Sequence, residues 1–161
     1  MEVYKKIQLS IHQTNNYKEK IEILQDAISR YKNPKIKEIC KKDVEKIETE
    51  IKAIINETIF SVEDHLLKNN LFKALEILNH FEQQYPYLAL NPKFQICKIN
   101  VSNIWIKKSN WEISQILMLE MYGDSKEARI RLQYIKNMLS TSDYENFHRK
   151  YNELLEKILK K

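Results

Sequence analysis

Residues 69–86 read Asn-Asn-Leu-Phe-Lys-Ala-Leu-Glu-Ile-Leu-Asn-His-Phe-Glu-Gln-Gln-Tyr-Pro. The stretch begins with two asparagines, whose side chains can accept hydrogen bonds from the free N–H groups of a first helical turn. Apolar residues then recur every three or four positions, which indicates an amphipathic helix. Proline cannot continue a helix, so Pro86 marks its end. The stretch therefore predicts one helix from about Leu71 to Tyr85.

A weaker copy of this stretch lies 54 residues earlier, and a third lies 54 residues later. The first two copies share identical residues at Asn15/Asn69, Asn16/Asn70, Glu22/Glu76, Ile23/Ile77, Leu24/Leu78 and Tyr31/Tyr85. The third copy starts at Gly123-Asp124 and keeps the apolar spacing at Leu24/Leu78/Leu132, Ala27/Phe81/Ile135 and Tyr31/Tyr85/Leu139. Self-similarity of this kind is typical of stacked helical units.

The composition predicts an all-α chain. Only one glycine and three prolines occur in 161 residues, and 43% of the residues are apolar. Strand-rich proteins use glycine freely in their turns, whereas helices tolerate neither residue in their interior. We expect eight or nine antiparallel helices in one helical-repeat domain covering residues 1–161.

Several of the expected helix ends rest on local signals. Asn33-Pro34 and Asn91-Pro92 combine a cap with a proline at the first helical position. Between Pro34 and Lys68 apolar or small residues alternate by four and three, the seam spacing of a long helix that packs on a partner. That partner is either another part of the chain or a second copy. We expect a break near Asn56, since a single helix of this length is unusual.

Further helix ends are expected in the C-terminal part of the chain. Ser109-Asn110 is expected to end one helix, and Gly123 to end the next in a left-handed conformation. Asp124 or Ser125 is expected to cap the helix that follows. Ser142 and Glu145 stand at the spacing of a capping box.

Charge and targeting signals exclude several classes of protein. The net charge is +5, but lysines alternate with glutamates along the chain, as on solvated helix faces. No segment concentrates positive charge, so we expect no nucleic-acid binding by this chain alone. The chain shows no apolar leader and no apolar run of membrane-spanning length. Two unpaired cysteines, Cys40 and Cys97, fit a reduced cytoplasmic protein.

The sequence contains no recognisable set of catalytic parts. The four histidines lie far apart, and no metal-ligand or phosphate-loop motif occurs. Glu63-Asp64-His65 resembles an acid–base cluster, but neighbouring residues on a helix point in different directions. We expect no enzyme activity, no metal and no cofactor.

Binding surface is what remains as a candidate function. Asn100, Asn103 and Lys107 form a polar stripe opposite the buried face of the helix that begins at Pro92. Asparagine amides can pair with the backbone of an extended peptide. Tyr134 and Asn137 occupy a comparable face of a later helix, with Arg131 placed to bind a peptide carboxylate. These six residues form either a peptide groove or ordinary solvated surface. Trp105 and Trp111 are expected in the core.

Two family resemblances follow from these residues. Ala74, Leu78 and Pro86 are similar to the second helix of a tetratricopeptide (TPR) unit, while Val62 and Thr58 replace the glycine and tryptophan of its first helix. The segment from Tyr122 to Ala128, the helix to Leu139 and the run from Tyr144 to Ile158 resemble the end of Rgg/MutR-type peptide-sensing transcriptional regulators.

The resemblance implies a degenerate TPR-like α-α superhelix that binds a short intracellular signalling peptide and forms a homodimer. Those regulators also carry a helix-turn-helix, which this chain lacks, so it is either an excised regulatory domain or a shortened relative. The alternative function is a stand-alone TPR-like adaptor or inhibitor that docks on a partner protein.

Overall fold

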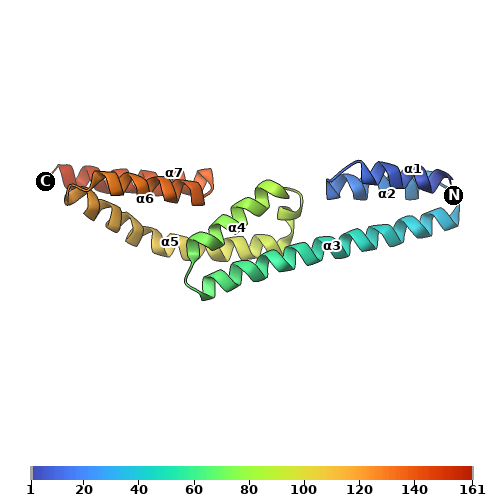
Figure 1. The fold of residues 1–161 in the computed structure, drawn as a ribbon, viewed down its shortest axis with the longest axis horizontal. Coiled ribbons are helices and arrows are strands. Elements are labelled where there is room, and N and C mark those ends of the chain that lie inside the picture. The colour runs from blue at the N-terminus through green and yellow to red at the C-terminus, as the bar shows by residue number, and fades with distance from the viewer. Residues whose placement is uncertain (1, 161) are drawn as a thin grey trace. The chain divides into compact units, whose positions relative to one another are not determined.

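A computed structural model describes residues 2–160 as an all-helical chain (Figure 1). Its elements are α1 (Glu2–His12), α2 (Tyr17–Arg30), α3 (Pro34–Leu67), α4 (Leu71–Gln84), the 3-10 helix η1 (Leu88–Leu90), α5 (Pro92–Met121), α6 (Ser125–Met138) and α7 (Thr141–Leu159). No strand occurs within the described residues, so the all-α prediction is confirmed. The chain divides into two compact units, Met1–Glu57 and Thr58–Lys161, which are described separately below.

The predicted repeat register is present in the helix boundaries. Helices α2, α4 and α6 each contain 14 residues, and each begins 54 residues after the previous one. The side chains of Asn16, Asn70 and Asp124 cap them by accepting from backbone N–H groups in the first turn, at 2.9, 3.2 and 3.3 Å. A capping side chain satisfies an N–H that has no partner within the helix. The repeat therefore sets where these three helices begin.

The described part of the chain contains seven α-helices, fewer than predicted, because two expected breaks do not occur. Helix α3 runs unbroken through Asn56, an exposed residue whose modest helix penalty the flanking buried Ile55 and Val62 outweigh. Helix α5 runs unbroken through Ser109, whose Oγ donates to the carbonyl of Ile106 at 2.8 Å. A serine that bonds to the preceding turn is accommodated inside a helix. One long helix, rather than two, therefore separates successive repeat helices.

The structure tests two other predicted helix boundaries, the end of α5 and the start of α7. Gly123 has φ 81°, as expected for a residue that ends α5 in the left-handed region. The cap of α7 is Ser140, which exchanges hydrogen bonds with Asp143 at 3.3 Å (backbone N–H) and 2.7 Å (carboxylate). The predicted box at Ser142 and Glu145 is therefore wrong by two residues, because α7 already begins at Thr141.

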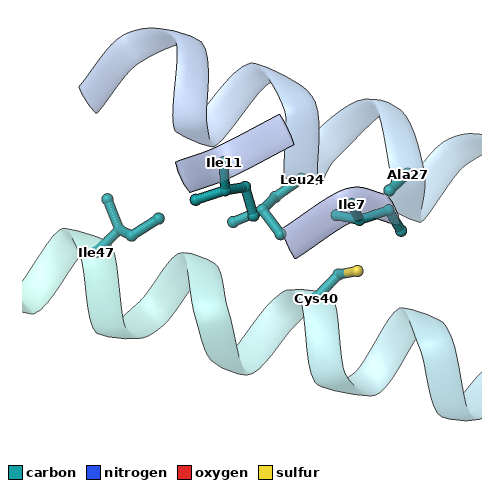
Figure 2. Packing of buried hydrophobic residues seen from close by; sticks show 6 residues of the cluster. All are labelled: Ile7, Ile11, Leu24, Ala27, Cys40 and Ile47. Atoms are coloured by element: carbon teal, nitrogen blue, oxygen red, sulfur yellow. The ribbon is translucent and has the colours of Figure 1, made fainter. Parts of the chain in front are cut away.

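The first unit packs around one small apolar cluster. Figure 2 shows the six buried side chains of this cluster: Ile7 and Ile11 of α1, Leu24 and Ala27 of α2, and Cys40 and Ile47 of α3. The members within each helix are three, four or seven positions apart, which places them on one face. Burial of these faces holds α1 and α2 against the N-terminal part of α3.

A polar network borders this cluster between α1 and α3. The Tyr4 hydroxyl donates to Oδ2 of Asp43 at 2.7 Å, and Nε2 of Gln8 donates to the same oxygen at 2.8 Å. Burial, then the hydrogen bond to Asp43 and the charge of that carboxylate, raise the pKa of Tyr4 to about 12. The network therefore favours the protonated phenol and ties α1 to α3.

The second unit is organised around α5. This helix contacts α4, α6, α7 and η1. Its buried side chains include Phe94, Val101, Trp105, Ile113 and Ile116. Phe94 stacks on Phe81 of α4 with ring centroids 4.6 Å apart.

The two tryptophans of α5 differ in burial. Trp105 is 4% exposed, as predicted, whereas Trp111 is 58% exposed. The expectation that both belong to the core is therefore wrong for Trp111. The reason is helical phase, because the uninterrupted α5 turns position 111 away from the face that carries Trp105 and Ile113.

We predict that Asp43→Asn lowers the pKa of Tyr4 from about 12 part of the way towards 10, since it removes the negative charge of the acceptor but keeps the burial and an amide oxygen that can accept. A folded-state pKa above the unfolded value stabilises the fold below pH 10, and this contribution is lost as pH rises towards 12. The pKa is measured as the difference in tyrosinate absorbance between the parent chain and Tyr4→Phe. A Tyr4 pKa near 10 in the parent chain would contradict the network.

Candidate functional site

A pocket of about 400 Å³ lies in the second unit, where the turn after α3 and the start of α4 meet the middle of α5. Its lining is made of Asn69, Asn70, Leu71, Phe72, Trp105, Lys108, Trp111 and Glu112. This volume falls within the usual range for small-ligand sites, which is roughly 300–1,000 Å³. The lining combines apolar and aromatic side chains with a few polar ones, the mixture that is typical of binding pockets.

The turn that forms one edge of the pocket is shaped by its two asparagines. Asn69 adopts a left-handed φ of 56°, which asparagine tolerates better than most residues. The backbone N–H of Asn70 donates to the His65 carbonyl at 2.8 Å and so closes the end of α3. The side chain of Asn70 then caps α4. Local hydrogen bonds therefore hold this edge in place.

Aromatic rings form the apolar wall. Phe72 contacts Trp105 with ring centroids 5.6 Å apart, and Tyr134 of α6 lies edge-on to Phe72 at 5.4 Å. Trp105 also contacts Phe147 of α7 at 5.5 Å. Tilted and edge-on contacts at these distances are favourable and restrict ring motion. The exposed Trp111 completes the lining at the solvent side.

The lining residue Glu112 takes part in an ion pair with Arg131. The side chain of Glu112 is 8% exposed, and its Oε2 accepts from Nη2 of Arg131 at 2.6 Å and from Nε at 3.1 Å. A carboxylate removed from water needs such compensation, because its desolvation is costly. The Arg131 guanidinium therefore permits Glu112 to occupy the pocket wall.

Lys108 is the other charged side chain of the lining. It is exposed, and no ion pair involves it anywhere in residues 2–160. Its position one turn before Glu112 places it on the same face of α5. The pocket therefore contains one compensated charge and one uncompensated positive charge.

Two further pockets occur in the second unit. One, of about 360 Å³, is lined by Thr58 and by side chains of α4 and Tyr85. The other, of about 320 Å³, lies between α5 and α7. Neither joins an exposed tryptophan to a buried carboxylate, so the pocket at the start of α4 is the strongest candidate site.

The structure brings two of the six predicted site residues to this pocket. Arg131 pairs with the lining residue Glu112, and the half-exposed Tyr134 contacts the lining residue Phe72. Asn137 accepts a hydrogen bond from Gln133 at 3.0 Å, within α6. The Arg131 guanidinium thus already holds a carboxylate of its own chain.

The remaining predicted residues, Asn100, Asn103 and Lys107, are exposed on α5 but line none of the three pockets. These three residues have the same i, i+3, i+7 spacing as Trp105, Lys108 and Glu112, but they lie on a different face of the helix. At about 100° per residue, the two sets lie roughly 140° apart around the helix axis. The predicted stripe and the pocket are separate surfaces of one helix.

All eight lining residues were missed as site residues. Asn69 and Asn70 were interpreted only as cap and turn, and Trp111 only as core. A usable signal was the i, i+3, i+7 set of Trp105, Lys108 and Glu112, which predicts one face once α5 is continuous. The pairing of Glu112 with Arg131, 19 residues further on, could not be predicted from the sequence.

Both cysteines, Cys40 and Cys97, are buried. Burial raises the pKa of the Cys97 thiol, with a contribution from Glu63, and burial likewise raises the pKa of Cys40. A raised pKa reduces the thiolate that nucleophilic chemistry requires. Residues 2–160 contain no group of three or more His, Cys, Asp or Glu side chains placed to hold a metal ion.

Comparison with protein-family models, curated proteins and solved structures finds no match for this chain. In the part of the chain that the structure describes, no helix combines the length and apolar character that crossing a membrane requires.

We predict that Arg131→Met destabilises the second unit by about 1–3 kcal/mol, because it leaves the Glu112 carboxylate buried without a partner. The expected loss of stability is smaller than for a fully buried pair, because the Arg131 side chain is 36% exposed. Urea unfolding followed by tryptophan fluorescence measures the change, since both tryptophans lie in this unit.

The matched control is Arg129→Met, an exposed change on the same helix, which should alter stability by less than about 0.5 kcal/mol. The double variant Glu112→Gln/Arg131→Met should recover much of the loss. Equal stability of Arg131→Met and the parent chain would show that Glu112 does not depend on this pair.

Proposed function

We propose that the chain is a non-catalytic peptide-binding module whose ligand is anchored in the pocket at the start of α4. This proposal rests on one observation, which is that the exposed Trp111 lines a pocket together with Phe72 and Trp105. A large aromatic side chain exposed beside a concave apolar surface is typical of binding hot spots.

Short peptides fit this site better than flat protein surfaces do. A pocket of about 400 Å³ holds one or two side chains. The Asn69 and Asn70 amides and the Glu112 carboxylate supply polar groups for backbone pairing. Phe72 and Trp105 are held by ring contacts on both sides, so little ordering is needed on binding.

The wider biological proposal follows the resemblance to Rgg/MutR-type regulators. On this basis the chain is a TPR-like sensor domain that binds a signalling peptide and dimerises. Its support is the 54-residue register of capped helices α2, α4 and α6 together with the motif around Gly123. The alternative is an adaptor that uses the same pocket to bind a segment of a partner protein.

We predict that Trp111→Ala weakens peptide binding at least about thirtyfold, the loss expected for a hot-spot tryptophan. The assay selects sequences from a random hexapeptide library with the full chain and then measures their affinity by calorimetric titration. Phe60→Ala removes another exposed aromatic residue of the same unit, outside all three pockets, and should leave affinity unchanged.

Failure of the library to yield any binding sequence would contradict the peptide-binding proposal. Equal losses in Trp111→Ala and Phe60→Ala would also contradict it, since they would indicate non-specific apolar binding. Because Trp111 is exposed, its replacement should not disturb the fold, which circular dichroism verifies.

A second copy of the chain has a candidate contact surface on α5. Ile96, Ile99 and Ile106 are exposed by 56–59%, and with Asn103 they are spaced by three, four and three residues. This is the spacing of a coiled-coil seam, in which one asparagine favours pairing with an identical helix. The stripe is short, so we expect a weak dimer.

We predict that light scattering at high micromolar concentration gives a mass near twice 19.4 kDa, and that Ile99→Asp returns it to 19.4 kDa. A charge in an apolar seam must be desolvated in both copies, which opposes association. Ile130→Asp, on the exposed surface of α6, is the control and should leave the mass unchanged. A parent chain of 19.4 kDa under these conditions would contradict the dimer.

A further inference from the structure

The charge of the pocket identifies the end of the peptide that it binds, provided that the proposed peptide-binding function holds. Glu112 and Arg131 neutralise each other through contacts of 2.6 and 3.1 Å. Lys108 has no ion-pair partner within residues 2–160. The uncompensated charge of the lining is therefore positive, which favours a ligand with a negative group.

The lining residues Asn70, Leu71 and Phe72 also carry hydrogen-bond donors. Oδ1 of Asn70 accepts a hydrogen bond from the backbone N–H of Lys73 at 3.2 Å, so the Nδ2 amide of Asn70 is the group left to donate to a ligand. The pocket also includes Leu71 and Phe72, the first two residues of α4. Their N–H groups have no acceptor within the helix, and they add to the positive potential that Lys108 provides.

One acceptor complements these donors. Both Arg131 contacts use Oε2 of Glu112, and among the described residues no hydrogen bond reaches Oε1. A carboxylate oxygen can accept from the backbone N–H of a bound peptide. An aliphatic acid would provide no such donor, so this oxygen favours a peptide.

We propose that the pocket binds the free C-terminus of a peptide. The terminal carboxylate pairs with the Lys108 ammonium, and the last side chain, aliphatic or aromatic, packs against Trp111 and Phe72. The N–H of that last residue donates to Glu112. An internal peptide segment would fill the apolar part but leave Lys108 without its partner.

The test uses fluorescence anisotropy of the full chain with N-terminally labelled hexapeptides that end in Leu, Ile, Phe or Trp. Each peptide is made with a free C-terminal carboxylate and with a C-terminal amide. The acid should bind about tenfold more tightly, the effect expected for one charge-assisted hydrogen bond. Lys108→Gln should abolish this preference.

Lys107→Gln is the matched control, because Lys107 is another exposed lysine on α5 that lines none of the three pockets described above. It should preserve the preference for the acid. Equal binding of acid and amide, with both lost in Trp111→Ala, would overturn this inference and leave the proposed function standing. Absence of binding by either form would overturn both.

Decanoate serves as a competitor that shares the carboxylate but lacks peptide groups. If decanoate displaces the peptides at the same concentration as the unlabelled acids, and with the same dependence on Lys108, the peptide assignment is wrong. We expect decanoate to bind at least tenfold more weakly than the acids, since it cannot donate to Glu112.

Discussion

The continuity of α5 is the constraint on which the second unit depends. A run of 30 residues without a break gives every side chain on it a fixed direction. Glu112 shares a face with Trp105 and Lys108 only because the helix passes through Ser109 without interruption. The bond from the Ser109 hydroxyl to the Ile106 carbonyl shows how a residue that often ends helices is accommodated. A break there would have separated the aromatic wall from the carboxylate.

The same constraint gives α5 three different surfaces. One is buried against α4, α6 and α7, one lines the pocket, and one carries Asn100, Asn103 and Lys107 among exposed isoleucines. Residues one or two positions apart therefore have different roles. Lys107 and Lys108 differ by a single step along the chain, yet only Lys108 reaches the pocket.

The all-α class and most helix boundaries could be predicted from sequence because their signals are local. Each signal involves residues within one turn of a helix end. These signals are the asparagine and aspartate caps, whose spacing gives the 54-residue register, and the left-handed Gly123. The breaks at Asn56 and Ser109 were mispredicted. These residues disfavour a helix only weakly, and the packing that outweighs this preference cannot be read from a single sequence. Neighbours such as Ile55 and Val62 outweigh the penalty at Asn56.

The site was less predictable, since it depends on contacts between distant residues. Arg131 was predicted to bind a peptide carboxylate, and in the structure its guanidinium pairs with Glu112 of the same chain, 19 residues away. Trp111 was assigned to the core because large aromatic residues are usually buried there. Only the phase of the continuous helix shows otherwise. The peptide-binding role of the whole surface stays a prediction.

Asn70 belongs at once to the scaffold and to the pocket, and this has an evolutionary consequence. Its side chain caps α4 while lining the site, so a substitution that altered ligand contacts there would also loosen the helix. Lys108 and Trp111 are exposed and carry no comparable duty in the fold. Under the proposed peptide-binding function, ligand preference can drift readily at these two positions, while the asparagine stays constrained by stability.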